Sequence, residues 1–388
     1  MFQAKSDIRE QDQQEINGML LKNDLTWFPT SLDEVLQRLD QIDPVKYGSD
    51  RNYLNGSVSY LSPYISRGLI STQFVLSQLL KKGYEPVNIE KFIQELAWRD
   101  YWQQIWKAKG DTINTDLKNK QGPVANHYVS KGIIDAQTGI EAIDKAIRDF
   151  YKSGYVHNHL RMYIASLACN VAQSHWKVPA KWMYYHLLDA DWASNALSWQ
   201  WVAGANSHKK YYANQENINK YCFTNQKNTF LDLPYEAFSQ LSIPETLKET
   251  VDLSLSTPLP EKNKISIDHN LPTCIYNFYN LDPAWKKDES VNRILLLEPS
   301  HFKEYPVSAK SIDFMFNLSL NVDHIQIFVG EFKELTTYHH VKNIYFKEHP
   351  LNKHYQGVEE QRDWMFPVQG YYPSFFSFWK QCKKQLYA

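Results

Sequence analysis

The chain has 388 residues, and its 42 lysines and arginines against 43 aspartates and glutamates give a formal net charge of -1. This length allows two or three domains with cores of their own, and the balanced charge argues against a protein that coats nucleic acid through bulk positive charge. Four widely spaced cysteines suggest neither a disulfide framework nor a zinc site, so a reducing cytoplasm is expected, without a signal peptide or a membrane span.

A helical pattern of apolar residues extends from about residue 31 to residue 230. Ser31 stands three residues before Glu34, which predicts a capping box at the start of SLDEVLQRLDQI. TGIEAIDKAIRDFYKSG predicts another helix that ends at Gly154. Residues 156–176 and 181–203 continue the pattern. Residues 31–230 are therefore expected to form an all-helical domain, preceded by an N-terminal extension over 1–30.

The pattern changes after residue 230. Residues 231–285 are polar and rich in proline, which predicts a linker or an extended wrap. Beyond them, short apolar runs predict buried strands in RILLLEP (293–299), HIQIFVG (324–330) and NIYFKEHP (343–350). SAKSIDFMFNLSL and SFFSFWKQCKKQL predict helices. The expected fold class is thus mainly α, with a small C-terminal α/β domain over 286–388.

One helical segment, DADWASNALSWQWVAG at 189–204, carries acids, an amide and indoles together. Asp191, Asn195 and Trp199 are spaced i, i+4 and i+8, so they share one stripe of a helix, and the small residues between them would let a flat molecule approach. On these residues alone a plain alternative stands, in which Asp189 and Asp191 cap the helix and the tryptophans are core.

Three further segments have a similar character. GSVSYLSPYISRGLIS (56–71) is rich in hydroxyls and leads into a helix, which suits phosphate oxygens. ELAWRDYW (95–102) places Glu95 and Arg99 on one side of a helix, and SGYVHNHLRM (153–162) offers an amide, a guanidinium and a thioether. Each segment alone would be interpreted as a solvated or core helix face.

Together and in this order, the four segments resemble the FAD-binding helical domain of the cryptochrome and DNA photolyase family, over about residues 45–225. The patterns ELxWRDxW, GxxHNxxRM and DxDWASNxxxWQW follow LSPYI in family order. The resemblance implies a deoxyribodipyrimidine photo-lyase that binds FAD. It would repair cyclobutane pyrimidine dimers in UV-damaged DNA by light-driven electron transfer from reduced FAD.

The resemblance also implies which residues hold the cofactor. Arg161 and Asp189 match a pair beside the flavin ring, where a cation favours the reduced anionic flavin. Asn195 matches the residue that faces flavin N5, and asparagine there is typical of the repair enzymes rather than of many signalling cryptochromes. The full set implied for cofactor binding is Tyr47, Ser59, Leu61, Ser62, Arg99, Asn158, Arg161, Asp189, Asp191 and Asn195.

Substrate residues follow from the same resemblance. Glu95 matches a carboxyl group that hydrogen-bonds the dimer, and Trp98 and Trp201 match aromatic walls that compensate a flipped base for lost stacking. Met162 matches a residue against the dimer, where enzymes acting on (6-4) lesions usually have a histidine. His159 stands where arginine is common, which predicts weaker phosphate contact that strengthens below about pH 6.5.

Flavin photoreduction in the family usually runs through three tryptophans. Trp199 and Trp176 match the first two and complete the set of catalytic residues with Glu95 and Asn195, but the third position is Ile133. The aromatic residues that could replace the missing exit are Tyr163, Trp182 and Tyr184. His208, Lys209 and Lys210 follow the flavin helix and could restore charge on the DNA face.

The arrangement of domains departs from the family, whose members normally begin with an α/β antenna domain. Here the expected α/β unit follows the helical domain, as a permuted or reduced antenna domain or as an unrelated one, and no antenna pigment or metal is assigned. The expected partner is UV-damaged DNA, with a preference for single strands given the modest charge, and a monomer is expected. The alternatives are a cryptochrome-like blue-light FAD photoreceptor without repair activity and a nucleic-acid-binding helical module without flavin.

Overall fold

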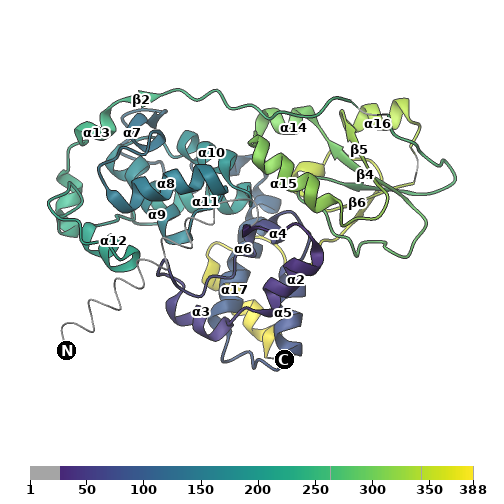
Figure 1. Cartoon of the computed structure of the whole chain (residues 1–388), viewed down its shortest axis with the longest axis horizontal. Coiled ribbons are helices and arrows are strands. Elements are labelled where there is room, and N and C mark those ends of the chain that lie inside the picture. Colours follow the sequence, from purple (N-terminus) through teal and green to yellow (C-terminus); the bar gives the residue numbers. More distant parts are fainter. Residues whose placement is uncertain (1–26, 263, 342, 388) are drawn as a thin grey trace.

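The computed structural model describes residues 27–262, 264–341 and 343–387, which form a helical part and an α/β part joined by a long extended segment (Figure 1). The first half of the helical part contains α2 (Leu32–Asp40), α3 (Pro44–Asp50), α4 (Ser62–Ser66), α5 (Thr72–Lys81), α6 (Glu90–Lys109) and the 3-10 turn η2 (Gly110–Asn114). The second half contains α7 (Lys131–Ile134), α8 (Glu141–Ser153), α9 (Asn158–Ser166), the π-helical turn η3 (Leu167–Val171), α10 (Lys177–His186), α11 (Trp192–Ala203), α12 (Gln215–Cys222), η4 (Tyr235–Gln240) and α13 (Glu245–Lys248).

The predicted capping box at Ser31 is wrong. The hydroxyl of Ser31 makes no capping hydrogen bond. The amide of Leu32 instead donates to Oδ1 of Asn321 at 2.8 Å, and Nδ2 of Asn321 donates to the carbonyl of Thr30 at 2.8 Å. A side chain from the α/β part thus caps α2, which a local sequence pattern cannot predict.

The helix predicted over 189–204 begins later than expected. Residues 187–190 are not helical, and α11 starts at Trp192 with Asp191 as its N-cap, whose carboxylate accepts from the amide of Ser194 at 3.0 Å. Asp189 therefore lies outside the helix, while Asp191, Asn195 and Trp199 keep the predicted spacing. The expected end of α8 at Gly154 is confirmed, because Gly154 takes the left-handed conformation with φ 68°.

The α/β part has one parallel sheet of five strands in the order β5-β4-β3-β6-β7. Its elements are β3 (Thr273–Tyr276), β4 (Asn292–Leu297), α14 (Pro299–Glu304), α15 (Ala309–Ser319), β5 (Ile325–Val329), α16 (Phe332–Tyr338), β6 (Ile344–Lys347), η5 (Pro350–Asn352) and β7 (Val358–Glu360). The three predicted strands correspond to β4, β5 and β6. Ile275 of β3 pairs with Ile294 of β4 and Phe346 of β6, so β3 is the central strand although it falls in the predicted linker.

The rest of that linker wraps around the molecule (Figure 1). Its strand β2 (Thr250–Val251) pairs with β1 (Val129–Ser130) of the helical part before the chain crosses to the sheet. The last helix, α17 (Phe375–Leu386), returns to the helical part and packs beside α6 (Figure 1). The hydroxyl of Tyr101 on α6 donates to the carbonyl of Tyr372 at 3.2 Å, just before α17. The C-terminal segment is therefore not confined to the α/β part.

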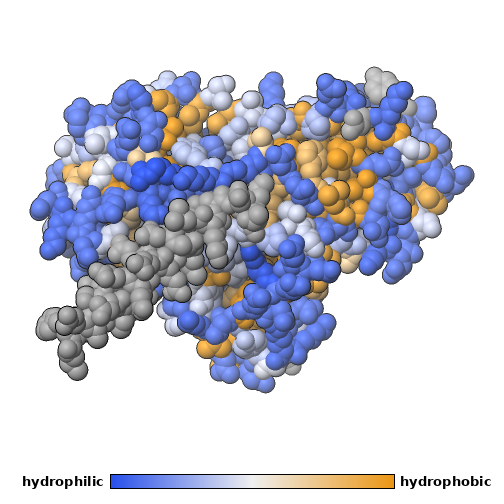
Figure 2. Space-filling view, viewed as in Figure 1, coloured by the Kyte–Doolittle hydropathy of each residue, from blue (hydrophilic) through white to orange (hydrophobic). Residues whose placement is uncertain are grey.

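Most tryptophans belong to the core, as single aromatic residues at helical spacing usually do. Trp106, Trp176, Trp182 and Trp192 are all buried. Cys169, Cys222, Cys274 and Cys382 are buried free thiols. The face drawn in Figure 2 is mostly hydrophilic, with separate hydrophobic areas that are most evident over the α/β part. Among the described helices, none combines the length and the apolar character that a membrane crossing needs.

Candidate functional site

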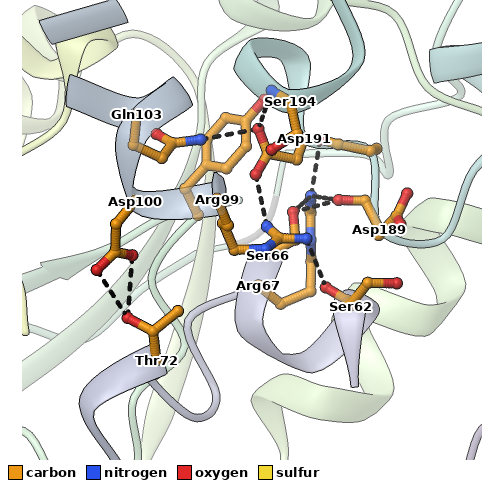
Figure 3. A network of polar contacts seen from close by, with 12 residues as sticks. Ser62, Ser66, Arg67, Thr72, Arg99, Asp100, Gln103, Asp189, Asp191 and Ser194 are labelled. Carbon is orange, nitrogen blue, oxygen red and sulfur yellow. Dashed lines mark hydrogen bonds and ion pairs between the residues drawn. The ribbon is translucent and has the colours of Figure 1, made fainter. Parts of the chain in front are cut away.

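Asp191 lies at the centre of a polar network between α6 and the start of α11 (Figure 3). Its carboxylate forms an ion pair with the guanidinium of Arg99 at 2.5 Å and accepts a hydrogen bond from the side-chain amide of Gln103 at 2.8 Å. Both residues lie on α6. Arg99 and Gln103 are four residues apart and so share one side of that helix. Because the carboxylate also caps α11, the side chain of Asp191 holds two of the predicted motifs together, the one on α6 and the one at the start of α11.

A second ion pair joins α9 to the segment before α11. Nη2 of Arg161 lies 2.9 Å from Oδ2 of Asp189, and Nε of Arg161 donates to the carbonyl of Val156 at 2.9 Å. Burial raises the pKa of Asp189, but the charge and the hydrogen bond of Arg161 outweigh it, so the net pKa is lowered and the carboxylate is ionised. The structure thus brings Arg99, Arg161, Asp189 and Asp191 together, as predicted.

The sequence interpretation missed Arg67, which is 0 % exposed in this network. Its Nη2 donates to the carbonyls of Asp189 and Ala190, each at 2.9 Å, and its guanidinium carbon lies 3.4 Å from the ring centroid of Phe278. Burial lowers the pKa of Arg67 to about 10, which leaves it charged at neutral pH. An arginine in a loop is usually exposed; Gly68 after it was the only local signal of close packing.

Asn195 and the two matched tryptophans lie in the interior. Nδ2 of Asn195 donates to the carbonyl of Ala180 at 2.8 Å, which leaves its amide oxygen without a hydrogen bond in the described structure. Trp199 is 2 % exposed, and Nε1 of Trp176 donates to Oδ1 of Asp116 at 2.8 Å. The hydrogen bond to Ala180 therefore holds the side chain of Asn195 in one orientation.

The third position of the tryptophan series, Ile133, is completely buried. Of the three aromatic residues predicted as replacements, Trp182 connects to this region, since its Nε1 lies 3.1 Å from the hydroxyl of Tyr151. That hydroxyl donates to the carbonyl of Ile134 at 2.8 Å. Tyr184 instead lies 3.0 Å from the hydroxyl of Tyr279, in the α/β part.

Glu95 and Trp98 lie on α6, one turn before the network. The carboxylate of Glu95 is 2.8 Å from Nζ of Lys91 and 3.5 Å from Nε of Arg51. Trp98 is half-buried, and its indole stacks on the phenyl ring of Phe375, from α17. The two predicted substrate residues share a helix, but each already has partners from elsewhere in the chain.

Asn158 and Met162 lie on one stripe of α9 and have surface exposed, with Nδ2 of Asn158 4.0 Å from Sδ of Met162. Trp201 at the end of α11 is 39 % exposed. His159 packs against Tyr221, and its burial together with the charge of Arg51 lowers its pKa to about 4. The expectation that His159 gains charge below about pH 6.5 is therefore wrong.

The predicted phosphate loop lies beside the network. The carbonyl of Ser62 accepts from Nη2 of Arg99 at 3.3 Å, and Leu61 is buried. Ser59 is half-buried. Tyr47 lies on α3, where its ring packs edge-on against Phe92 of α6 at 4.9 Å.

Beyond α11, the cations expected on the DNA face differ in their surroundings. His208 and Lys209 are exposed, whereas Lys210 is half-buried and its burial lowers its pKa. Only His208 and Lys209 therefore present their charge-bearing groups at the surface.

A cavity of about 480 Å³ lies elsewhere, at the carboxyl ends of β3 and β4 where the α/β part meets η2. Its lining includes Phe278, Glu298, His301, Tyr305 and Asn114. None of the residues predicted for cofactor, substrate or catalysis lines it, so it is distinct from the network around Asp191. Within the described part of the chain, histidines, cysteines and carboxylates form no group of three or more that could hold a metal ion.

Comparison with known proteins agrees with the geometry of the helical part. Residues 92–235 match the family described as the FAD binding domain of DNA photolyase. This region resembles the photolyase and cryptochrome family. The photolyase match contains Arg99, Arg161, Asp189 and Asp191, the four residues of the two ion pairs, whereas the α/β part and α17 lie outside it.

Several photolyases resemble the chain over part of its length. A deoxyribodipyrimidine photo-lyase of Alkalihalophilus pseudofirmus is 25% identical over 48% of this chain and 40% of its own, and one of Streptomyces griseus is 30% identical over 38% and 32%. A mitochondrial one of Saccharomyces cerevisiae is 30% identical over 40% and 30%. The chain thus spans about a third to two-fifths of these relatives.

Two solved structures have partial likeness to the photolyase-like part. The cryptochrome of Synechocystis is 25% identical with a TM-score of 0.45, covering 49% of this chain and 42% of the other. A class III photolyase from Agrobacterium tumefaciens is 22% identical with a TM-score of 0.39, covering 55% and 51%.

Proposed function

We propose that the chain binds FAD and uses light to repair cyclobutane pyrimidine dimers in DNA, with single strands as the preferred substrate. The observation that carries the proposal is the pair of ion bridges at the start of α11, Arg99–Asp191 and Arg161–Asp189. They join α6, α9 and α11 at the residues that the family resemblance assigns to the cofactor.

The residues around these bridges suit a flavin. A flavin ring has several carbonyl and nitrogen acceptors and needs donors at fixed positions. Arg161 is held by Asp189 yet keeps part of its side chain exposed, and Asn195 is held by the carbonyl of Ala180. The hydroxyl of Ser194 is buried without a hydrogen-bond partner among the described residues. A buried hydroxyl normally has a partner, and a cofactor atom would supply one.

Each side chain then has a stated task. Arg161, Asn158 and Asn195 would bind and orient the flavin, while Asp189 and Asp191 keep the nearby guanidinium groups in place. The positive charge of Arg161 favours a negatively charged ring in a site of low dielectric. Bound reduced FAD supplies the chemistry, which is donation of an electron to the dimer in blue light and its recovery after ring opening.

The substrate side is formed by α6, α9 and the end of α11. Trp98 and Trp201 would stack against the flipped bases, Met162 would contact them, and Glu95 would hydrogen-bond the dimer. With Lys91 and Arg51 beside it, Glu95 is an ionised carboxylate and accepts hydrogen bonds. It would therefore bind the ring N–H groups of the dimer rather than its carbonyls.

The deciding experiment uses a short single-stranded oligonucleotide that carries one thymine dimer. Full-length protein, loaded with FAD and reduced beforehand, is incubated with it under blue light and in the dark, and loss of the dimer is measured by chromatography. Light-dependent loss is expected. Bound flavin without repair would favour the cryptochrome-like sensor, and a protein that takes up no flavin would contradict both.

A further inference from the structure

Phe375, the first residue of α17, lies flat against Trp98. The ring centroids are 3.7 Å apart, and the planes differ by 9°. Trp379, one turn later on α17, lies parallel to the same phenyl ring, with 6.3 Å between centroids and 8° between planes. Phe375 is buried, whereas Trp98 keeps part of its surface exposed. The phenyl ring therefore covers one face of the indole and leaves other indole surface accessible.

The position of Phe375 is fixed at both ends of α17. Ser374 and Ser377 form a capping box that starts the helix at Phe375. At the other end, Nζ of Lys383 lies 2.8 Å from Oε1 of Glu90, and the hydroxyl of Tyr387 donates to Oε2 of the same carboxylate at 2.9 Å. Because Glu90 begins α6, these contacts hold α17 along the helix that carries Trp98.

Phe375 approaches Trp98 from the side of α6 that faces away from Asp191. Glu90 and Tyr101 contact α17, while Arg99 and Gln103 point to Asp191 on the opposite side of α6. Glu95 points to Arg51 and Lys91. The covered face of the indole is thus the one toward α17, not the one toward the network.

We propose that Phe375 is a positioning residue for Trp98. It holds the indole in the orientation that a base needs for stacking, so the C-terminal helix, outside the photolyase match, completes the substrate wall. This inference rests on the function proposed above. Ordering a mobile side chain on binding weakens affinity, and a stacked aromatic neighbour removes that cost in advance.

The first test compares three variants of the full-length, FAD-loaded protein. Phe375→Leu removes the ring but keeps a buried apolar side chain, and Phe375→Tyr keeps the ring. Phe376→Leu is the matched control, because Phe376 is the next residue of the same helix and is 70 % exposed. Binding of the single-stranded dimer oligonucleotide should weaken about three- to tenfold in Phe375→Leu only. Repair per bound dimer should stay unchanged in all three.

The second readout does not depend on DNA. In protein labelled with 5-fluorotryptophan, the fluorine resonance of Trp98 is assigned by its loss in Trp98→Phe. It should shift and broaden in Phe375→Leu and remain in place in Phe375→Tyr and Phe376→Leu, because the stacked ring both shields the indole and limits its motion.

The outcomes separate this inference from the proposed function. An unchanged Trp98 resonance in Phe375→Leu overturns the inference whatever the DNA result, and so does equal or tighter dimer binding by that variant. If the unmodified protein binds no dimer but the resonance changes as expected, Phe375 still positions Trp98, and it is the proposed function that fails.

Discussion

Glu95 lies between two cations, and this arrangement decides what it can offer a substrate. The ammonium of Lys91 at 2.8 Å and the guanidinium of Arg51 at 3.5 Å fix an ionised carboxylate at the start of the proposed substrate wall. Such a group accepts hydrogen bonds, and a charged hydrogen bond contributes about 1.5–3 kcal/mol.

Glu95→Gln should therefore lower dimer affinity about ten- to hundredfold, since the neutral amide is a weaker acceptor for ring N–H groups. Titration of the dimer oligonucleotide by fluorescence anisotropy measures this change. Glu85→Gln, at an exposed glutamate before α6, provides the control. Equal affinity of the two variants would mean that Glu95 does not contact the dimer.

Asp191 is expected to matter for stability as much as for the cofactor. It is buried and neutralises Arg99, whose side chain is 16% exposed, while it also caps α11. Asp191→Asn keeps the shape but leaves the guanidinium without its counter-charge. Breaking a buried pair on one side costs about 3–5 kcal/mol, and the partial exposure of Arg99 places the expected loss at about 2–4 kcal/mol.

Urea unfolding of the apoprotein, followed by tryptophan fluorescence, measures the effect of Asp191→Asn. Glu245→Gln breaks the exposed pair with Lys248 and should cost less than about 1 kcal/mol. A loss of similar size in both variants would show that the Arg99–Asp191 bridge contributes no more than a surface pair.

Single residues also mark the limit of prediction from the sequence. That the carboxylates and guanidinium groups of the network lie together was predictable, because several motifs in family order implied a shared site. Arg67 was not, since its burial depends on Phe278 and the carbonyl groups of Asp189 and Ala190, which are distant in the sequence. A buried cation without a carboxylate partner has no local pattern.

At the scale of the elements, the backbone of the helical part comes very close to that of the α/β part just after α4. Gly68 has φ +66°, and a Cβ added there would lie 2.7 Å from the carbonyl oxygen of Tyr279. Leu281 also donates its amide to the carbonyl of Arg67 at 2.9 Å. The backbones of the helical and α/β parts therefore meet at a point where only glycine fits.

Gly68→Ala should destabilise the protein by about 2–4 kcal/mol, from the strained backbone together with the clash against the α/β part. Gly83→Ala is the matched control, because Gly83 has φ +87° but nothing within 4 Å of the added Cβ. Gly83→Ala should lower the free energy of unfolding by the cost of the backbone strain alone, about 1–2 kcal/mol. Thermal and urea unfolding measure both, and equal losses would refute the close docking.

Among the strands, β4, β5 and β6 were predictable from their continuous apolar runs, whereas β3 was not. Its four residues follow Pro272 in a polar, proline-containing stretch, and they form a strand because β4 and β6 pair with both of its edges. The existence of α17 was predicted from its periodicity. Its destination beside α6 was not, since an amphipathic helix does not specify which surface it covers.

At the scale of the whole molecule, burial lowers the pKa of six histidines among the residues that the structure describes. The pKa is lowered to about 4 in four of them, His157, His159, His186 and His301. The pKa of His349 is well below its usual range, and that of His175 is also lowered. In the unfolded chain these groups titrate near 6.5. Between pH 6.5 and about 4 the unfolded chain therefore binds protons that the folded protein does not. The free energy of unfolding of the protein must decrease as the pH is lowered through this range.

Among the described residues, three groups act in the opposite direction, Asp100, Asp282 and His354, because each has a raised pKa. Burial raises the pKa of Asp100 to about 6, so the folded protein keeps a proton there that the unfolded chain releases above about 4, and this favours folding as the pH falls below 6. The hydrogen bond to Glu298 raises the pKa of His354, which adds stability below 6.5 that is lost as the pH rises through the raised value. The six lowered histidine pKa values outweigh these three raised ones, so a net loss of stability on acidification is expected.

Unfolding in urea at pH 7, 6 and 5 should therefore give steadily lower midpoints. His157→Gln tests the cause, because a glutamine keeps an acceptor for the amide of His159 but takes up no proton. It should reduce the slope of the unfolding free energy with pH by up to about 1.4 kcal/mol per pH unit. His208→Gln, which changes an exposed histidine, is the control. A protein as stable at pH 5 as at pH 7 would show that the buried histidines accept protons without unfolding.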